Sequence, residues 1–254
     1  MVLDWGGSMI GPEALTRALY IPARKGSLQP ELVAQARRQQ RLVYPIQGEL
    51  SALLDELQAG HPVLVLQNLA LNWWPAWHYA VAIGFDPARA EILLHSGTIE
   101  RHRTALPTFM RTWARSGYWG LVVLQPGELP ASAQPGPYLA AAFDLEASGF
   151  QEAAELAYQA GIARWPEHAG LWIALANRHY ARGQTDLAAS TLRQGTTKGA
   201  ASGALYHNLA LLLADLGEWQ EAQAAAQQAL NFPDAPSAAG QSAQDIIRQR
   251  QPQK

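Results

Sequence analysis

The stretch HYAVAIGFDPARAEILLHSG, residues 78–97, decides how the first half of this chain folds. It contains two apolar runs, 78–85 and 91–97, each with the length and composition of a buried strand. Asp86 and Pro87, which follow the first run, are residues that start turns. The stretch therefore predicts two antiparallel strands joined as a hairpin.

Helices and further strands are predicted on both sides of this hairpin. Apolar runs indicate strands at 41–46, 62–69 and 119–127. Helical spacing and end signals indicate helices at 11–20, 27–40, 48–60 and 107–117. Since helices come first and antiparallel strands follow, the sequence predicts an α+β domain over residues 1–128.

Composition narrows the classes of function. The chain has 254 residues, 48% hydrophobic and 16% charged, which fits two globular domains. Its net charge of −2 argues against nucleic acid as a partner, and no apolar run approaches the ~18 residues of a membrane span. With no cysteine, the chain has no disulfide, thiolate metal site or cysteine nucleophile of its own. We expect no cofactor. We also expect no metal ion, because His95 and His102 are seven residues apart and no third metal-ligating residue stands at a suitable spacing from them.

The second half of the chain repeats with a period of 34 residues. Residues 129–137, LPASAQPGP, are predicted to be a linker from their proline and small residues. Beyond them, similar residues recur at 34-residue intervals: Tyr138, Trp172 and Tyr206; Ala142, Ala176 and Ala210; Gly149, Gly183 and Gly217. This pattern resembles the tetratricopeptide repeat, a pair of antiparallel helices, in three copies over 138–236. Residues 237–254 are predicted to form a capping helix and a tail.

In tetratricopeptide repeats, the first helix of each pair lines the concave groove. The residues expected there are largely apolar or aromatic: Leu139, Phe143, Glu146, Ile173, Asn177, Tyr180, His207, Leu211 and Asp215. A clamp for acidic C-termini needs several Lys, Arg and Asn, and only Asn177 fits. The groove therefore suits a hydrophobic peptide or a protein ligand, or else it packs against the neighbouring domain.

His78, at the start of a predicted strand, has the strongest signal for chemistry. A histidine that acts as a base needs a group that orients its other ring nitrogen. Asp86 lies about 26 Å along the strand at ~3.3 Å per residue, so it is interpreted as a turn residue. In the predicted hairpin His78 faces residues 96–98, and Ser96 is the best-placed orienting group, with His95 and Thr98 beside it.

Polar and aromatic residues precede His78. Gln67 and Asn68 end the preceding strand and are expected to cap it, with a contribution to a site as the alternative. Trp73, Trp74 and Trp77 form an aromatic cluster that either walls a cleft for a peptide or packs within the domain.

Three segments, AGHPVLVLQN (59–68), HYAVAIGFD (78–86) and ILLHSG (92–97), occur in an order and spacing typical of papain-like cysteine peptidases. Residues 1–127 resemble the bacteriocin-processing members, which cut after a double glycine. The resemblance implies a papain-like α+β fold with His78 as the base. It also implies a cysteine that opens a helix, whose end corresponds to MVLDWGG at residues 1–7. That cysteine would lie about two helical turns before Met1, with the oxyanion-hole glutamine further upstream.

The resemblance also sets an expectation for Ser96. Its position is usually an aspartate or asparagine in the family, and a serine can orient an imidazole without stabilising an imidazolium as a carboxylate does.

Three hypotheses about function follow from the sequence. The first is an inactive, peptide-binding or scaffolding protein, and the second is a fragment of a cysteine peptidase. The third is an adaptor whose repeats carry all function. The chain as it stands predicts a cytoplasmic location, and export would require a signal sequence upstream.

Overall fold

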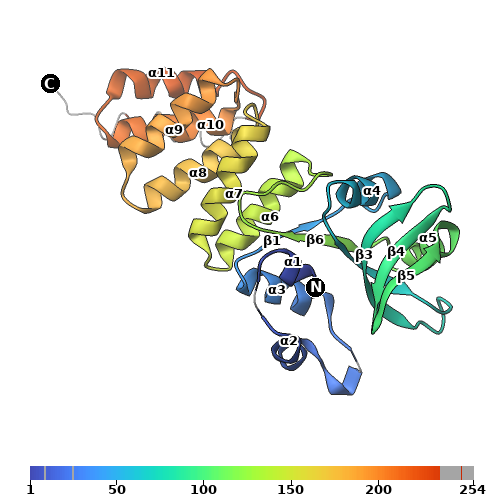
Figure 1. Cartoon of the computed structure of the whole chain (residues 1–254). Helices are drawn as coiled ribbons and strands as arrows, with labels where there is room; N and C mark the ends of the chain where they lie inside the picture. The colour runs from blue at the N-terminus through green and yellow to red at the C-terminus, as the bar shows by residue number, and fades with distance from the viewer. Residues whose placement is uncertain (9, 25, 235–246, 248–254) are drawn as a thin grey trace. The chain divides into compact units, whose positions relative to one another are not determined.

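The computed structural model describes residues 1–8, 10–24, 26–234 and 247. The chain divides into two compact units, Met1–Ala153 and Ala154–Lys254. The first contains a sheet with helices and the second is helical (Figure 1). The expected order of an α+β part followed by a helical part is confirmed.

The first unit is built on one antiparallel sheet. Its strands lie in the order β1-β6-β2-β3-β4-β5, and all neighbours are antiparallel. Their bounds are β1 Leu42–Pro45, β2 Val63–Asn68, β3 Trp77–Asp86, β4 Glu91–Ser96, β5 Ile99–Ala105 and β6 Gly120–Leu124. The predicted hairpin is the pair β3 and β4, and the three other predicted strands are β1, β2 and β6.

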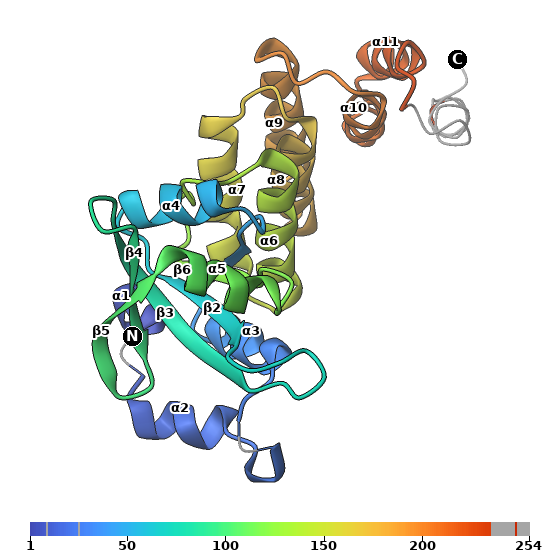
Figure 2. The same cartoon turned by 90° about the vertical axis from the view of Figure 1, so that its right-hand side faces the viewer.

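Helices cover both faces of the sheet (Figure 2). Those of the first unit are α1 Val2–Trp5, α2 Pro12–Leu19, α3 Gln29–Arg38, α4 Leu50–Gln58, α5 Leu106–Ala114 and α6 Pro135–Ala147, with a 3₁₀ turn at Pro22–Arg24. On one face, Leu3 of α1 and Ala36 of α3 form a buried cluster with Val81, Leu121 and Val123 of the sheet. On the other face α5 buries Phe109 and Trp113, both fully inaccessible to solvent.

Strand β5 was not predicted from the sequence. Its residues, IERHRTA, are nearly all exposed because β5 lies at the edge of the sheet, so they show no apolar run. Gly97, which has a positive φ of 60°, supports the tight turn from β4 into β5. Backbone pairing with β4, rather than burial of apolar side chains, stabilises this strand.

The predicted linker at 129–137 is instead an ordered part of the first unit, whose boundary falls at Ala153. The buried Glu56 carboxylate on α4 accepts hydrogen bonds from the backbone N–H of Ala131 (3.1 Å) and of Ser132 (2.8 Å), and from Ser132 Oγ (2.6 Å). The Gln134 N–H donates to Tyr44 Oη at 3.1 Å. Composition alone did not reveal these distant partners, and α6, the first predicted repeat helix, follows within the same unit.

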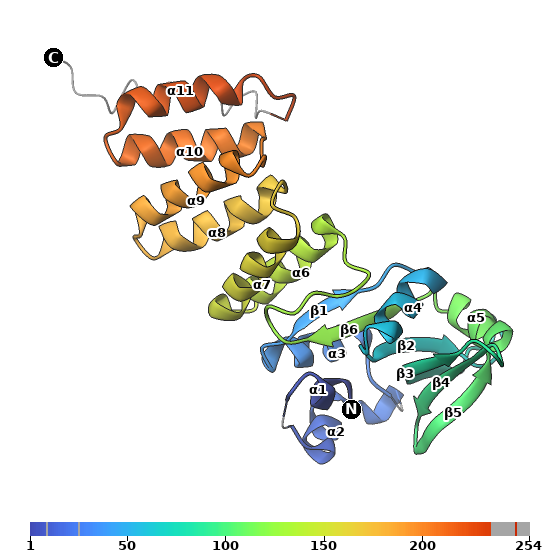
Figure 3. The same cartoon turned by 45° about the horizontal axis from the view of Figure 1, so that its top comes forward.

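The helices of the second half recur at the predicted period. They are α7 Gln151–Arg164, α8 Ala169–Ala181, α9 Thr185–Thr197, α10 Gly203–Asp215 and α11 Trp219–Ala229. Helices α6, α8 and α10 begin 34 residues apart, as do α7, α9 and α11. Figure 3 shows α8 with α9 and α10 with α11 as antiparallel pairs. The 34-residue helical repeat is therefore confirmed.

Three glycines turn the chain between the helices of each pair. Gly149, Gly183 and Gly217 have φ values of 91°, 74° and 78°, which L-residues with side chains rarely adopt. In the second pair, the N–H of Gln184, which follows the glycine, donates to the carbonyl of His179, five residues earlier, at 3.0 Å. The same bond recurs in the first and third pairs, so the glycine role predicted from the repeat is confirmed.

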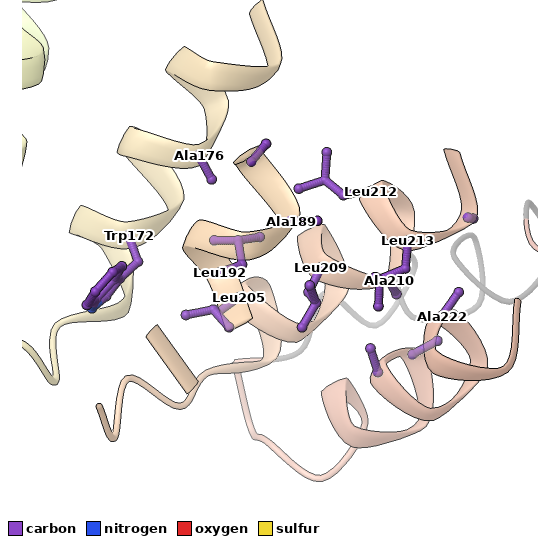
Figure 4. Packing of buried hydrophobic residues seen from close by; sticks show 14 of the residues in the cluster. Trp172, Ala176, Ala189, Leu192, Leu205, Leu209, Ala210, Leu212, Leu213 and Ala222 are labelled. Carbon is purple, nitrogen blue, oxygen red and sulfur yellow. The ribbon is translucent and has the colours of Figure 1, made fainter. Parts of the chain in front are cut away.

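Small and large residues alternate in the core of the second unit (Figure 4). Trp172 of α8 packs over Gly195 of α9, where an added Cβ would lie 2.9 Å from the indole Cγ. Ala188 and Leu192 are fully buried beside them. The predicted capping helix and tail at 237–254 lie outside the described residues except for Ile247, which is buried in this cluster.

Candidate functional site

The predicted contact between His78 and Ser96 is present. Ala80 of β3 pairs with Ser96 of β4, so His78, two residues back, lies diagonally across from Ser96 on the same face. The imidazole Nε2 is 2.8 Å from Ser96 Oγ. The hairpin register thus produces the arrangement that the sequence indicated.

The second ring nitrogen of His78 is available for chemistry. Within the described residues, Nδ1 has no hydrogen-bond partner, and the side chain is only partly buried. Burial lowers the pKa of His78 below the usual value of 6.5, because the charged imidazolium loses hydration. A neutral imidazole oriented at Nε2 could accept a proton at Nδ1.

Asp86 lies away from this pair, as expected of a turn residue. Its Oδ1 accepts the Arg89 N–H at 3.2 Å, and its Oδ2 accepts from Arg103 at 3.1 Å. Desolvation acts to raise the pKa of Asp86, but the hydrogen bonds and charges of Arg103 and Arg89 together outweigh it and hold that pKa below its usual value. The carboxylate closes the hairpin turn and takes no part in orienting His78.

Among the described residues, His95 and Thr98 form no hydrogen bond with His78. His95 follows Leu94 and precedes Ser96 on β4, so its side chain leaves the opposite face of the sheet. His102 lies on β5, paired with Leu94. No group of three metal-ligating side chains occurs in the described ranges.

Gln67 and Asn68 act as structural residues. Gln67 pairs with His78 in register, and its Nε2 donates to Thr112 Oγ1 of α5 at 2.7 Å. Asn68 Oδ1 accepts the N–H groups of Ala70 (3.1 Å) and Ala76 (2.9 Å), which shapes the loop between β2 and β3. The sequence carried no signal for Thr112 as a partner.

Of the three tryptophans near His78, Trp77 lines a cavity, whereas Trp73 and Trp74 are exposed to solvent. A cavity of about 580 Å³ is lined by residues 26–29 on one side and by Leu66, Trp77 and Tyr79 on the other, with Ser116. Trp73 and Trp74 do not line it, and they are 78% and 72% exposed. Because Trp77 and Tyr79 alternate with His78 along the strand, the imidazole points away from this cavity.

The predicted groove residues fall in both units. Phe143, on α6, belongs to the first unit and is 60% exposed. In the second unit, Tyr180 of α8 donates through its hydroxyl to Asp215 Oδ2 of α10 at 3.0 Å. Ile173 and Asn177 lie on α8, and His207 and Leu211 lie at the matching positions of α10, 34 residues later. All four are at least partly accessible to solvent.

Comparisons with known proteins give little information on function. No family model and no curated protein matches this chain. Among solved structures, it is similar to the type III secretion translocator chaperone SycD of Yersinia enterocolitica, with 20% identity and a TM-score of 0.39. That alignment covers 45% of this chain and 81% of the chaperone chain. No described helix is long and apolar enough to cross a bilayer.

Proposed function

We propose that this protein binds peptides or other proteins through its repeat helices, and that its first unit is a papain-like peptidase domain without a nucleophile. The repeat would then be of the tetratricopeptide type. The absence of cysteine supports the inactive reading, because a papain-like peptidase requires a thiolate.

The observation that carries the proposal is the paired accessible surface of α8 and α10. Ile173 and His207 stand 34 residues apart, as do Asn177 and Leu211, so the same helix positions are accessible in both repeats. The bond from Tyr180 to Asp215 joins the two helices on this surface. An apolar surface with a few amide, imidazole and carboxylate groups suits an amphipathic helical or extended peptide.

The test is peptide binding by the full chain, measured by fluorescence anisotropy with labelled apolar amphipathic peptides and acidic C-terminal peptides. We expect the apolar peptides to bind. The affinity should fall about tenfold in Tyr180→Ala and in Leu211→Ala, because each removes a side chain that the ligand would bury.

Leu187→Ala is the matched control, since Leu187 on α9 is 44% exposed and lies outside this surface. Equal loss in Leu187→Ala, or no binding of apolar peptides by the unmodified chain, would contradict the proposal.

A cysteine peptidase is the second candidate, favoured by the geometry of His78. Its Nε2 contacts Ser96, and its Nδ1 faces no partner in the described part of the chain, as a base awaiting a thiol would. This candidate requires a cysteine from outside residues 1–254.

An in-frame Cys-Gly-Pro segment upstream in the coding sequence is the first test of this candidate. In the extended protein, iodoacetamide should alkylate that cysteine at a pH below the usual thiol pKa, and His78→Gln should remove this advantage. The candidate fails if no such cysteine exists, or if its reactivity does not depend on His78.

A further inference from the structure

The loop between β2 and β3 exposes an unusual amount of apolar side chain. It extends beyond the end of the sheet (Figure 2). Trp73, Trp74 and Trp77 are 78%, 72% and 56% exposed, and Leu69 and Leu71 are 53% and 51% exposed. Single exposed apolar residues are ordinary, but five within nine residues form a patch that indicates an interaction.

This patch carries no charge. The sequence has no Asp, Glu, Lys or Arg between Glu56 and Asp86, so the loop, β2 and the part of β3 before Asp86 contain no acidic or basic residue other than His78. The residues of the loop itself therefore offer a partner no charge. An occupant must be recognised by apolar and aromatic contact.

Hydrogen bonds from buried and partly buried side chains and within the loop backbone hold the loop in one conformation. Asn68 is buried, and its Oδ1 accepts two loop N–H groups, while the Leu69 N–H donates to the Ala76 carbonyl at 2.9 Å. The Arg115 guanidinium donates to the carbonyls of Asn68 (3.4 Å) and Ala70 (2.7 Å). The loop backbone is therefore ordered before binding, which lowers the ordering cost to that of the exposed side chains.

The same bonds lower the cost of taking the loop out of water. Backbone groups that leave water unpaired are costly, and here the N–H groups of Leu69, Ala70, Trp74 and Ala76 already have partners inside the loop. Pro75 has no N–H to satisfy.

The shape of the tip favours a deformable partner. Trp73 and Trp74 line no described cavity and project outward, whereas peptide and small-molecule sites are concave. Tryptophan prefers the boundary between lipid headgroups and acyl chains, where its ring is buried and its N–H stays near water.

We propose that the loop Leu69–Trp77 docks this protein on the interfacial region of a lipid bilayer, with Trp73 and Trp74 entering at headgroup level. Binding is reversible and peripheral, carried by aromatic insertion. It is independent of the peptide surface on the repeat helices.

The test is flotation of the full chain with vesicles of phosphatidylcholine alone and with added phosphatidylglycerol. We expect binding to both compositions and little change when salt is raised, because no loop charge takes part. The double variant Trp73→Ala/Trp74→Ala should lower the partition coefficient about tenfold or more. Brominated lipids should quench the fluorescence of the unmodified chain and not that of the variant.

Tyr20→Ala/Leu187→Ala is the matched control, because Tyr20 and Leu187 are 47% and 44% exposed and lie outside the loop. It should bind as the unmodified chain does. Binding only to phosphatidylglycerol vesicles with loss at high salt would overturn the proposal, as would equal binding by the tryptophan variant or no binding at all. If the unmodified chain is dimeric without lipid and the tryptophan variant is monomeric, the loop is a protein interface and the proposal is wrong.

Discussion

The sheet unit and the helical repeat are stabilised in different ways. In the repeat, Gly149, Gly183 and Gly217 make the same turn three times, and the hydrogen bond between α8 and α10, from Tyr180 to Asp215, spans 35 residues, about one repeat. In the sheet unit, the contact of Glu56 with Ser132 is made once, between residues 76 apart. A substitution in the sheet unit should therefore disturb distant segments, while one in the repeat should act locally.

The largest effect is expected at Glu56. Glu56→Ala removes the acceptor for two backbone N–H groups and for Ser132 Oγ, and it also removes the partner of His61 Nδ1 at 2.6 Å. Loss of such a buried carboxylate should cost about 3 kcal/mol of unfolding free energy. Chemical denaturation of the full chain measures this cost, and faster hydrogen exchange at residues 131–134 would show that the distant segment is released.

Asp55→Ala is the control, because Asp55 is exposed on the same helix. It should change the unfolding free energy by less than about 0.5 kcal/mol. Unchanged exchange at residues 131–134 in Glu56→Ala would show that the 129–137 segment is held by something else.

The next largest effect is expected at Gly195 in the repeat. In Gly195→Ala the new Cβ would lie 2.9 Å from Trp172 Cγ, a ring atom that cannot swing away freely. Overpacking of this kind costs about 1–3 kcal/mol, more than the helix propensity that alanine gains. In a Trp172→Leu background the penalty should shrink, and a double-mutant cycle by denaturation measures that coupling. An equal penalty in both backgrounds would rule out the clash.

A smaller effect is expected at the turn glycines. Gly183→Ala forces alanine into a φ of 74°, at a cost of about 1–2 kcal/mol. Gly217→Ala should cost nearly the same, because the turn is repeated. Gly136→Ala is the control, since Gly136 has open space around its Cα and no positive φ. Unequal costs for the two turns, measured by denaturation, would weaken the idea that the repeats are equivalent.

The smallest effect is expected at Ser96, and it concerns the pKa of His78 and the pH dependence of stability. Burial lowers the pKa of His78, so as pH falls the unfolded chain takes up the proton first, and this group's contribution to stability declines below about 6.5. In Ser96→Asp, a carboxylate near Nε2 should raise the pKa of His78 relative to the unmodified chain. If that pKa rises above the unfolded value, the carboxylate adds stability at low pH that is lost as pH rises through the new pKa. Histidine NMR titration measures the pKa of His78 in each variant. Ser96→Asn is the uncharged control, and if it gives the same pKa as Ser96→Asp, the charge is not the cause of the shift.

Much of the architecture was predictable because it depends on local patterns. The apolar runs around Asp86-Pro87 specify the β3–β4 hairpin, and strand length then places His78 diagonally across from Ser96, within hydrogen-bond distance. The 34-residue spacing of glycines and small residues specifies the repeat, since each helix pair contacts mainly its neighbours. These features follow from residues near one another in the chain.

Tertiary structure alone decided the rest, because the contacts that decide it leave no local apolar or repeat pattern in the sequence. The 129–137 segment looks like a linker by composition, yet Glu56 and Tyr44 bind it to the first unit. Strand β5 has no burial pattern and forms only because β4 offers it an edge. The sequence by itself determined the hairpin, the repeat and the candidate base, whereas hydrogen bonds to Glu56 and Tyr44, 76 and 90 residues away, decided that the 129–137 segment belongs to the first unit.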